Sequence, residues 1–325
     1  MNVSAWVWVV VAVLVLGSGL AMAAAAGETA PAAAPAGAAP EAGAKEAAPA
    51  AGAKEAAAGF LFSEGFEDAD LLKRGWYDGT KFKISTENPY AGKGCIEFHW
   101  NAGTTTPESS SGARHPVTPT DPVYLRYYIR LSKGWGWSGR TYHPHLSHFM
   151  TTENPPYHGP ASSHLTTYLE PVNGKLRLAL TDMQNADAPH GLTQGPLKGG
   201  YNGKEYDSAQ VLFNDDQWHC VEAMYKLNSV DVAKSTWARD GVIKGWFDGK
   251  LVVDRNDIVL RTVDYPNMKF NQFLLTPYFG QGLLPHEQTL WIDELVVSSE
   301  PIGPMEKPTA KPAAEGAQAP ASSRP

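Results

Sequence analysis

Short runs of alternating apolar and polar residues, separated by turn residues, make up most of the chain between residues 60 and 300. In the run Cys95–Trp100 every second side chain is large and apolar, and the run Leu125–Leu131 alternates in the same way. A period of two is typical of β-strands that bury one face and leave the other polar. The pattern therefore predicts an all-β, antiparallel β-sandwich whose sheets share one core.

Turn signals at short intervals support the same fold class. Glycine, proline and Asn/Asp clusters separate the alternating runs, and Asp248-Gly249 suits the positive φ angles of a tight hairpin turn. A closing strand is predicted over 289–297. One domain over residues 60–300, roughly 240 residues, is an ordinary size for a single sandwich.

The N-terminal segment has the pattern of a signal peptide over residues 1–23. An unbroken apolar run from Trp6 to Leu16 precedes the small-residue triplet Ala21-Met22-Ala23. Residues 1–5 carry no Lys or Arg, so a retained membrane anchor is the alternative. The run is shorter than the roughly 20 residues of a spanning helix. We expect cleavage after Ala23, no stable membrane insertion afterwards, and export to the periplasm, the cell surface or the medium.

Two flanking segments differ from the domain in composition. Residues 24–59 and 301–325 are rich in Ala and Pro and poor in large apolar side chains. Such segments bury too little apolar surface to offset the entropy of ordering. We predict a disordered linker and a disordered C-terminal tail.

The second half of the domain carries a family resemblance. It holds a long predicted strand after Trp218, the hairpin at Asp248-Gly249 and the closing strand. These features resemble the concanavalin A-like lectin and glucanase superfamily, which implies a jelly-roll sandwich. Within it, the chain looks most like the polysaccharide lyases that cut alginate or glucuronan. The residues that carry this likeness are Val221-Glu222, Lys226-Leu227-Asn228, Asp240-Gly241, Trp246-Phe247-Asp248-Gly249 and Arg261.

Composition agrees with a polysaccharide partner, and an acidic one is expected. The formal net charge of −7 and the lack of a basic run argue against nucleic acid. Trp135 and Trp137 lie among glycines in a predicted loop, where an exposed pair would form a platform for sugar rings. The sequence does not define an oligomeric state.

β-Elimination on a uronic acid polymer requires three roles: a group that neutralises the C6 carboxylate, a base for the C5 proton and an acid for the leaving O4. Arg126 and Arg130 suit the first role and share a strand face, with Tyr128 between them. A solvated or salt-bridged outer face is the alternative. The candidate acids and bases are His145, His148, Lys226 and Tyr278. Further candidate substrate contacts are Glu222, Arg261 and Gln281.

Two other functions remain open. A carbohydrate-binding or cell-surface module needs only the fold, the tether and a few aromatic side chains. A glycoside hydrolase ranks third, because no Glu-x-Asp-x-Glu run is present. For a hydrolase, the side chains of Glu97 and Glu222 would have to come close together from neighbouring strands to form the catalytic pair of carboxylates.

The histidines and cysteines define no cofactor site. The spacing in His143-Pro-His-Leu-Ser-His148 matches no zinc motif, so no metal is predicted, and ordinary loop histidines are the alternative. No cofactor is expected, and a structural calcium ion stays open without being indicated. Cys95 and Cys220 are a candidate disulfide in an exported protein, and two half-buried thiols are the alternative.

Overall fold

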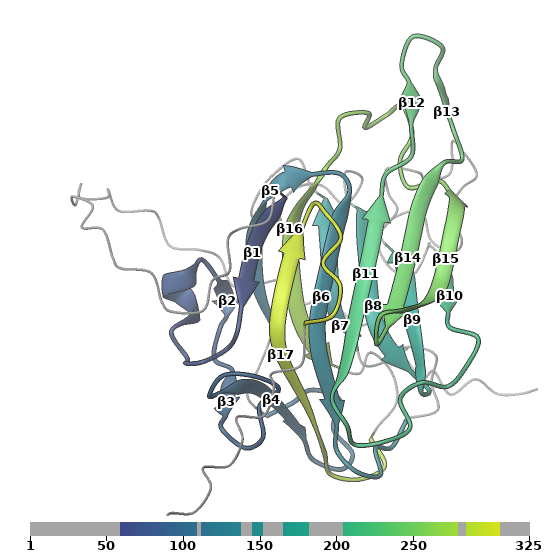
Figure 1. Ribbon diagram of the computed structural model, residues 1–325. Coiled ribbons are helices and arrows are strands. Elements are labelled where there is room, and N and C mark those ends of the chain that lie inside the picture. The colour runs from purple at the N-terminus through teal and green to yellow at the C-terminus, as the bar shows by residue number, and fades with distance from the viewer. Residues whose placement is uncertain are drawn as a thin grey trace, which may run out of the picture. The chain divides into compact units, whose positions relative to one another are not determined.

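The computed structural model describes residues 59–108, 112–137, 145–151, 165–181, 204–278 and 284–305. They form two antiparallel β-sheets packed face to face (Figure 1), which confirms the predicted sandwich. The predicted signal peptide, almost all of the linker, and residues 306–325 lie outside the described residues. Within the described part, no helix is long and apolar enough to cross a membrane.

The first sheet has the order β15-β14-β11-β6-β17-β4-β3, and β1 pairs with β17. Its strands are β1 (Phe60–Glu64), β3 (Lys83–Ser85), β4 (Cys95–Trp100), β6 (Val123–Leu131), β11 (His219–Lys226), β14 (Gly241–Phe247), β15 (Lys250–Ile258) and β17 (Gln288–Ser298).

The second sheet has the order β10-β9-β8-β7-β16-β5-β2. Its strands are β2 (Tyr77–Gly79), β5 (Gly112–Thr120), β7 (His145–Thr151), β8 (Leu165–Val172), β9 (Lys175–Thr181), β10 (Glu205–Asp207) and β16 (Phe270–Tyr278). A small hairpin of β12 (Val230–Asp231) and β13 (Thr236–Trp237) projects beyond the end of the sheets (Figure 1).

The core lies between the two sheets and is built from the apolar half of each alternating run. Phe98 and Tyr127 of the first sheet and Phe149 and Phe273 of the second are all buried in it. Burying an aromatic side chain of this kind stabilises the fold by about 2 to 3 kcal/mol. The hydroxyls of Tyr127 and Ser147 lie 3.2 Å apart and join the sheets across this core.

The hairpin predicted at Asp248-Gly249 connects β14 to β15. Both residues have positive φ angles, 49° and 76°. The Asp248 carboxylate also accepts a hydrogen bond from the backbone N–H of Cys220, at 2.8 Å. The turn is therefore fixed to the neighbouring strand β11 as well as to its own two strands.

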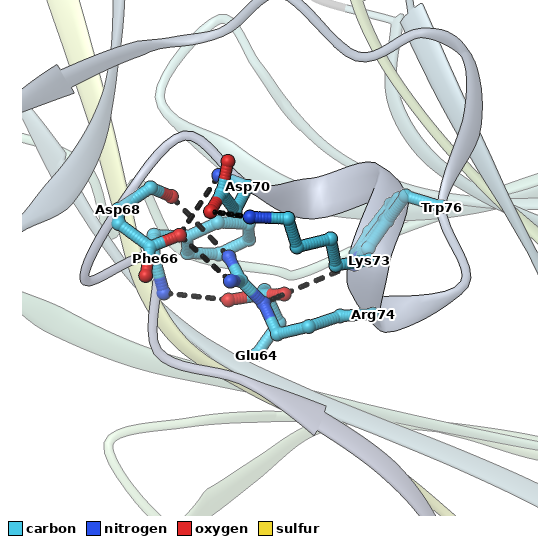
Figure 2. A network of polar contacts seen from close by, with 7 residues as sticks. All are labelled: Glu64, Phe66, Asp68, Asp70, Lys73, Arg74 and Trp76. Carbon is cyan, nitrogen blue, oxygen red and sulfur yellow. Dashed lines mark hydrogen bonds and ion pairs between the residues drawn. The ribbon is translucent and has the colours of Figure 1, made fainter. Parts of the chain in front are cut away.

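A buried carboxylate organises the segment that follows β1 (Figure 2). Glu64 accepts hydrogen bonds from the backbone N–H of Phe66 (2.9 Å), Nε of Arg74 (2.8 Å) and Nε1 of Trp76 (3.1 Å). Arg74 also donates to Asp68 at 2.7 Å. These bonds hold the short 3₁₀-helix η1 (Leu71–Arg74) against the end of β1 and place Trp76 in the core.

Residues 299–305, here called the C-terminal strap, cover part of the outer face of the first sheet (Figure 1). The Glu222 carboxylate accepts the backbone N–H groups of Ile302 (3.1 Å) and Gly303 (3.0 Å). Arg126 donates to the carbonyl oxygen of Gly303 at 3.4 Å, and the Tyr128 hydroxyl accepts from the N–H of Met305 at 2.8 Å. These contacts extend five residues past the domain end expected at residue 300.

Both cysteines are free thiols, so the structure decides against the disulfide. Cys95 and Cys220 do point to the same outer face of the first sheet, as the alternation predicted. However, β17 and β6 lie between their strands. Three strand spacings of about 4.8 Å separate the two thiols far beyond the reach of a disulfide.

Candidate functional site

The outer face of the second sheet carries a group of buried polar side chains. In β8, Leu165 and Leu169 face the core, so Thr166, Tyr168 and Glu170, which alternate with them, face outward, and all three are buried. Burying polar groups costs free energy unless each finds a hydrogen-bond or charge partner, and buried polar clusters with shifted pKa values are concentrated at functional sites. This face is therefore the candidate site.

The centre of the face is the pair His148 and Tyr168. They are direct partners across β7 and β8, and their ring centroids lie 4.0 Å apart at an interplanar angle of 66°. His148 is only 4% exposed and Tyr168 only 5%. Leu274 of β16 pairs with His148 on the other side, and Arg114 of β5 pairs with Leu274. The backbone register thus aligns these residues in one row across neighbouring strands.

A charged cluster lies beside this row. Glu170 is the cross-strand partner of Arg177, which in turn pairs with Asp207 of β10. The Arg177 guanidinium forms two parallel hydrogen bonds to Asp207, Nε to Oδ1 at 2.6 Å and Nη2 to Oδ2 at 2.9 Å, and an ion pair to Glu205 at 2.8 Å. Burial alone would lower the pKa of Arg177, but its bonds to Asp207 raise it. Arg177 thus remains charged and is held in place by the two acids.

Glu170 is the residue of this cluster with the most altered acidity. Burial raises its pKa to about 8, although the nearby Arg177 opposes the shift. Glu170 is therefore largely protonated at neutral pH and can donate a proton or a hydrogen bond. Tyr168 and Glu170 are two residues apart on one strand face, which places their Cα atoms about 7 Å apart, a span close to that of a sugar ring.

At the other end of the row, Tyr77, Gln272 and Arg114 form a second polar group. Gln272 donates its side-chain N–H to the Tyr77 hydroxyl at 2.6 Å, and Arg114 pairs with Asp78. Burial raises the pKa of Tyr77. The face therefore offers a cation, an amide, an imidazole and a neutral carboxylic acid. Those are the group types required to bind a uronate, abstract a proton and protonate a leaving oxygen.

Arg126, Tyr128 and Arg130 share one strand face, as the alternation indicated, but it is the outer face of the first sheet. Arg126 is 5% exposed and donates to the carbonyl oxygens of Gly303 and Glu294. Tyr128 stacks on Tyr90 with 3.5 Å between ring centroids. Arg130 donates to the carbonyl oxygen of Asp216 and lies over the Trp291 ring. These contacts occupy the three side chains.

Three other candidate residues lie on or near the first sheet. Glu222 binds the C-terminal strap, and Lys226 is exposed at the end of the same strand. Arg261 donates to the carbonyl oxygens of Asn228 (3.0 Å) and Met268 (3.0 Å) and thereby fixes a loop. The single groove expected to combine the arginines of β6, Lys226 and His148 is not what the structure shows, because β6 and β7 belong to opposite sheets.

The remaining candidates divide into two groups. His145 and Tyr278 pair in register across β7 and β16, and only their backbones are described. Gln281 lies outside the described residues. Trp135 and Trp137 line a pocket at one end of the sandwich, away from the row of β7 and β8.

Sequence reasoning missed Tyr168, Glu170 and Arg177, together with Arg114 and Gln272. One signal was present, because Arg177 interrupts three alternating leucines, Leu176, Leu178 and Leu180. A charged residue in phase with the outer face is ordinary on a solvated sheet. The burial that makes Arg177 unusual depends on tertiary structure.

The described residues contain no group of three or more His, Cys, Asp or Glu side chains arranged to hold a metal ion. Asp207 and Glu205, the acids nearest Arg177, are already paired with its guanidinium.

Comparison with solved structures places the fold among jelly-roll polysaccharide lyases. The alginate lyase vAL-1 from Chlorella virus matches with a TM-score of 0.52 and 15% sequence identity, over 71% of this chain and 97% of its own. The marine PL-14 alginate lyase from Aplysia kurodai matches with a TM-score of 0.52 and 12% identity, over 74% of this chain and 99% of its own. The predicted resemblance to jelly-roll lyases of this type is thereby confirmed at the level of the fold. Neither the protein-family models nor the curated proteins give a match.

Proposed function

We propose that this protein is a polysaccharide lyase that cleaves a uronic acid polymer by β-elimination on the outer face of the second sheet. The observation that carries the proposal is the buried row of His148 and Tyr168 with Glu170 beside it, on a fold shared with two alginate lyases. A stable sheet does not need an imidazole, a phenol and a carboxylic acid buried together on its outer face.

Each step of the elimination has a candidate group on this face. Glu170, in its neutral form, donates a hydrogen bond to the C6 carboxylate and so acidifies the C5 proton. His148 accepts that proton as the C5–H bond breaks, and the electron pair of the C5–H bond forms the C4=C5 double bond. The C4–O4 bond then breaks, and the Tyr168 hydroxyl supplies the proton to O4. No oxidant or co-reactant is required, so atoms and electrons balance within substrate and protein.

The proposal extends to location and partner. The apolar run, the small-residue triplet and the Ala/Pro-rich linker of the N-terminal 59 residues support export, and a polysaccharide outside the cytoplasm would then be the partner. Two charge features favour an acidic polymer, the guanidinium of Arg114 and the protonated state of Glu170. A protonated acid accepts an anionic neighbour that a carboxylate would repel.

The test is the ultraviolet absorbance of the unsaturated product, measured on alginate, glucuronan and related uronate polymers. His148→Ala and Tyr168→Phe should each reduce turnover by about 100-fold or more while the protein stays folded, as expected for loss of a general base or acid. Lys234→Ala, in the projecting hairpin, is the matched control and should keep full activity.

Two results would redirect the proposal. Loss of activity in Arg130→Ala, with His148→Ala unaffected, would move the active site to the outer face of the first sheet. No product from any polymer, combined with retention on acidic polysaccharide that His148→Ala abolishes, would indicate a binding module on the same face. Salt dependence of that retention would show that charge contributes to binding.

A further inference from the structure

A pocket of about 380 Å³ lies at the end of the sandwich, where β6 ends and β11 begins. Its volume is at the lower end of the range typical of small-molecule sites. Three aromatic side chains line it, those of Trp135, Trp137 and Phe213. Its other lining residues are Leu131, Ser132, Lys133, Gly134, Asn214, Asp215 and Asp216.

The loop that carries the two tryptophans is rigidly held. The buried Gln288 amide bonds Gly136 in both directions, accepting from its N–H at 2.9 Å and donating to its carbonyl oxygen at 3.1 Å. His286 contacts the carbonyl oxygen of Gly134 at 2.9 Å. A Cβ atom at Gly136 would lie 2.5 Å from Pro285 and 2.7 Å from His286, so a larger residue would force one of these side chains to move. Trp135 and Trp137 are therefore preorganised, which lowers the entropic cost of binding a ligand.

The opposite wall is also anchored. Arg130 donates to the carbonyl oxygen of Asp216 at 2.7 Å, and His219 holds Asp215 Oδ1 at 2.8 Å. The N–H of Gln217 donates to the same Oδ1 at 3.0 Å. In the part of the chain that the structure describes, the bonds to Asp215 thus converge on one oxygen. Oδ2 keeps its capacity to accept a hydrogen bond from a ligand hydroxyl.

From this geometry we propose that the pocket is a second carbohydrate-binding site, which takes a neutral hexopyranose unit. Indole faces stack on the C–H faces of a sugar ring, while carboxylate and amide groups bind its hydroxyls. Among the lining residues the two acids, Asp215 and Asp216, outnumber the one cation, Lys133. The charged His219 that binds Asp215 also binds Asp248, so this pair adds no net positive charge at the rim. This balance disfavours a uronate, which would meet like charge at the rim. The site would hold a neutral glycan while the outer face of the second sheet acts on a different polymer segment. Binding in this pocket does not depend on the elimination proposed above.

The experiment is calorimetric titration of the full chain with cellotetraose, mannotetraose and laminaritetraose, and with trigalacturonate as the anionic comparison. At least one neutral tetrasaccharide should bind with a Kd of about 1 mM or tighter, and trigalacturonate at least about 10-fold more weakly. Trp137→Ala should weaken neutral binding by about 10-fold or more. Trp237→Ala, in the β12–β13 hairpin, is the matched control and should bind as the unchanged protein does.

A second variant covers the case in which Trp137→Ala fails to fold. Asn214→Leu changes an exposed loop side chain at the pocket wall and should weaken neutral binding with no change in circular dichroism. The proposal is overturned if no neutral tetrasaccharide binds at about 10 mM. It is equally overturned if both variants bind as the unchanged protein does, or if trigalacturonate binds as tightly as the neutral ligands.

Discussion

Glu170 and Arg177 are direct cross-strand partners on the outer face of the second sheet, yet Arg177 forms its two parallel hydrogen bonds with Asp207 instead. The guanidinium charge is therefore largely balanced by Asp207 and Glu205. Glu170 remains buried near a positive group that other carboxylates already neutralise. This arrangement explains why burial dominates and the pKa of Glu170 rises to about 8.

The first prediction concerns stability against pH. Below about pH 4.5, Glu170 is protonated in both the folded and the unfolded chain and contributes no pH dependence. As the pH rises toward 8, the unfolded chain loses this proton while the folded protein keeps it, so the folded state is progressively disfavoured. Glu170→Gln removes this cost and should stabilise the protein at pH 8 on the order of 4 kcal/mol, but not at pH 4.

Urea denaturation at pH 4, 6 and 8 measures the difference. Glu87→Gln, an exposed change elsewhere on the domain, is the matched control and should show no such trend. Identical pH profiles for Glu170→Gln and the unchanged protein would mean that Glu170 is ionised in the folded state. Its proposed role as a neutral donor to the substrate carboxylate would then be wrong.

The second prediction concerns His219, which bridges Asp248 and Asp215 with 2.8 Å on each side. Both ring nitrogens face carboxylate oxygens, so both must carry protons, and the imidazole must be positively charged. Burial alone would lower the pKa of His219, but the bonds to Asp248 and Asp215 together raise it. The resulting stability is fully present below the unfolded pKa of about 6.5 and is lost as the pH rises through the folded pKa.

His219→Gln should therefore lower the Tm more at pH 6 than at pH 9. Because both carboxylates are nearly half exposed, we expect a loss of about 1 kcal/mol at pH 6. Asp248→Asn keeps an oxygen acceptor for the N–H of Cys220 but removes one of the two carboxylates that bind His219. It should therefore also lower the Tm more at pH 6 than at pH 9. A Tm difference that does not change with pH would exclude a charged imidazole.

The strands were predictable because their alternation is local. In β6, Leu125, Tyr127 and Ile129 face the core, and the arginines between them face outward, as a period of two requires. The turn at Asp248-Gly249 was equally clear, since its conformation depends on those two residues. Local signals of this kind distinguish side chains that face the core from side chains that face outward, without reference to the rest of the chain.

The site was not predictable in the same way, because alternation does not show which sheet a strand joins. Arg126 and His148 both face outward, but from opposite sheets. Arg126 is also covered by the C-terminal strap, whose sequence resembles the Ala/Pro-rich tail that follows it. Nor does a strand pattern reveal burial of an outer face, which distinguishes Glu170 from an ordinary surface carboxylate.

The third prediction concerns the thiols. Burial raises the pKa of Cys95 to about 12 and that of Cys220 to about 11. Because the thiolate is the reactive form, both should react slowly with a thiol reagent in the folded protein at pH 8. Unfolding without reductant should release two reactive thiols, and reductant should leave the Tm unchanged. Titration that finds no free thiol in the unfolded chain would contradict the strand order, which separates the two residues by β17 and β6.

The fourth prediction compares two truncations that differ by five residues. A chain that ends at residue 305 keeps every described contact of the C-terminal strap, whereas one that ends at residue 300 loses residues 301–305. The buried Glu222 carboxylate would then lose two N–H donors, and Arg126 would lose the carbonyl oxygen of Gly303.

Leaving a buried charged group without partners costs about 1 to 3 kcal/mol, although water entering at the cut end would recover part of it. For a domain of this size, a net loss of about 2 kcal/mol lowers the Tm by about 4 to 8 °C. The chain that ends at 305 should melt within about 1 °C of the full-length protein, because residues 306–325 have too few large apolar side chains to add much buried surface. Scanning calorimetry on the two truncations shows whether residues 301–305 stabilise the domain or contribute as little as the tail that follows them. If both melt together with the full chain, the hydrogen bonds from Ile302, Gly303 and Met305 contribute no net stability, and the outer face of β6 and β11 is open to solvent or to a ligand.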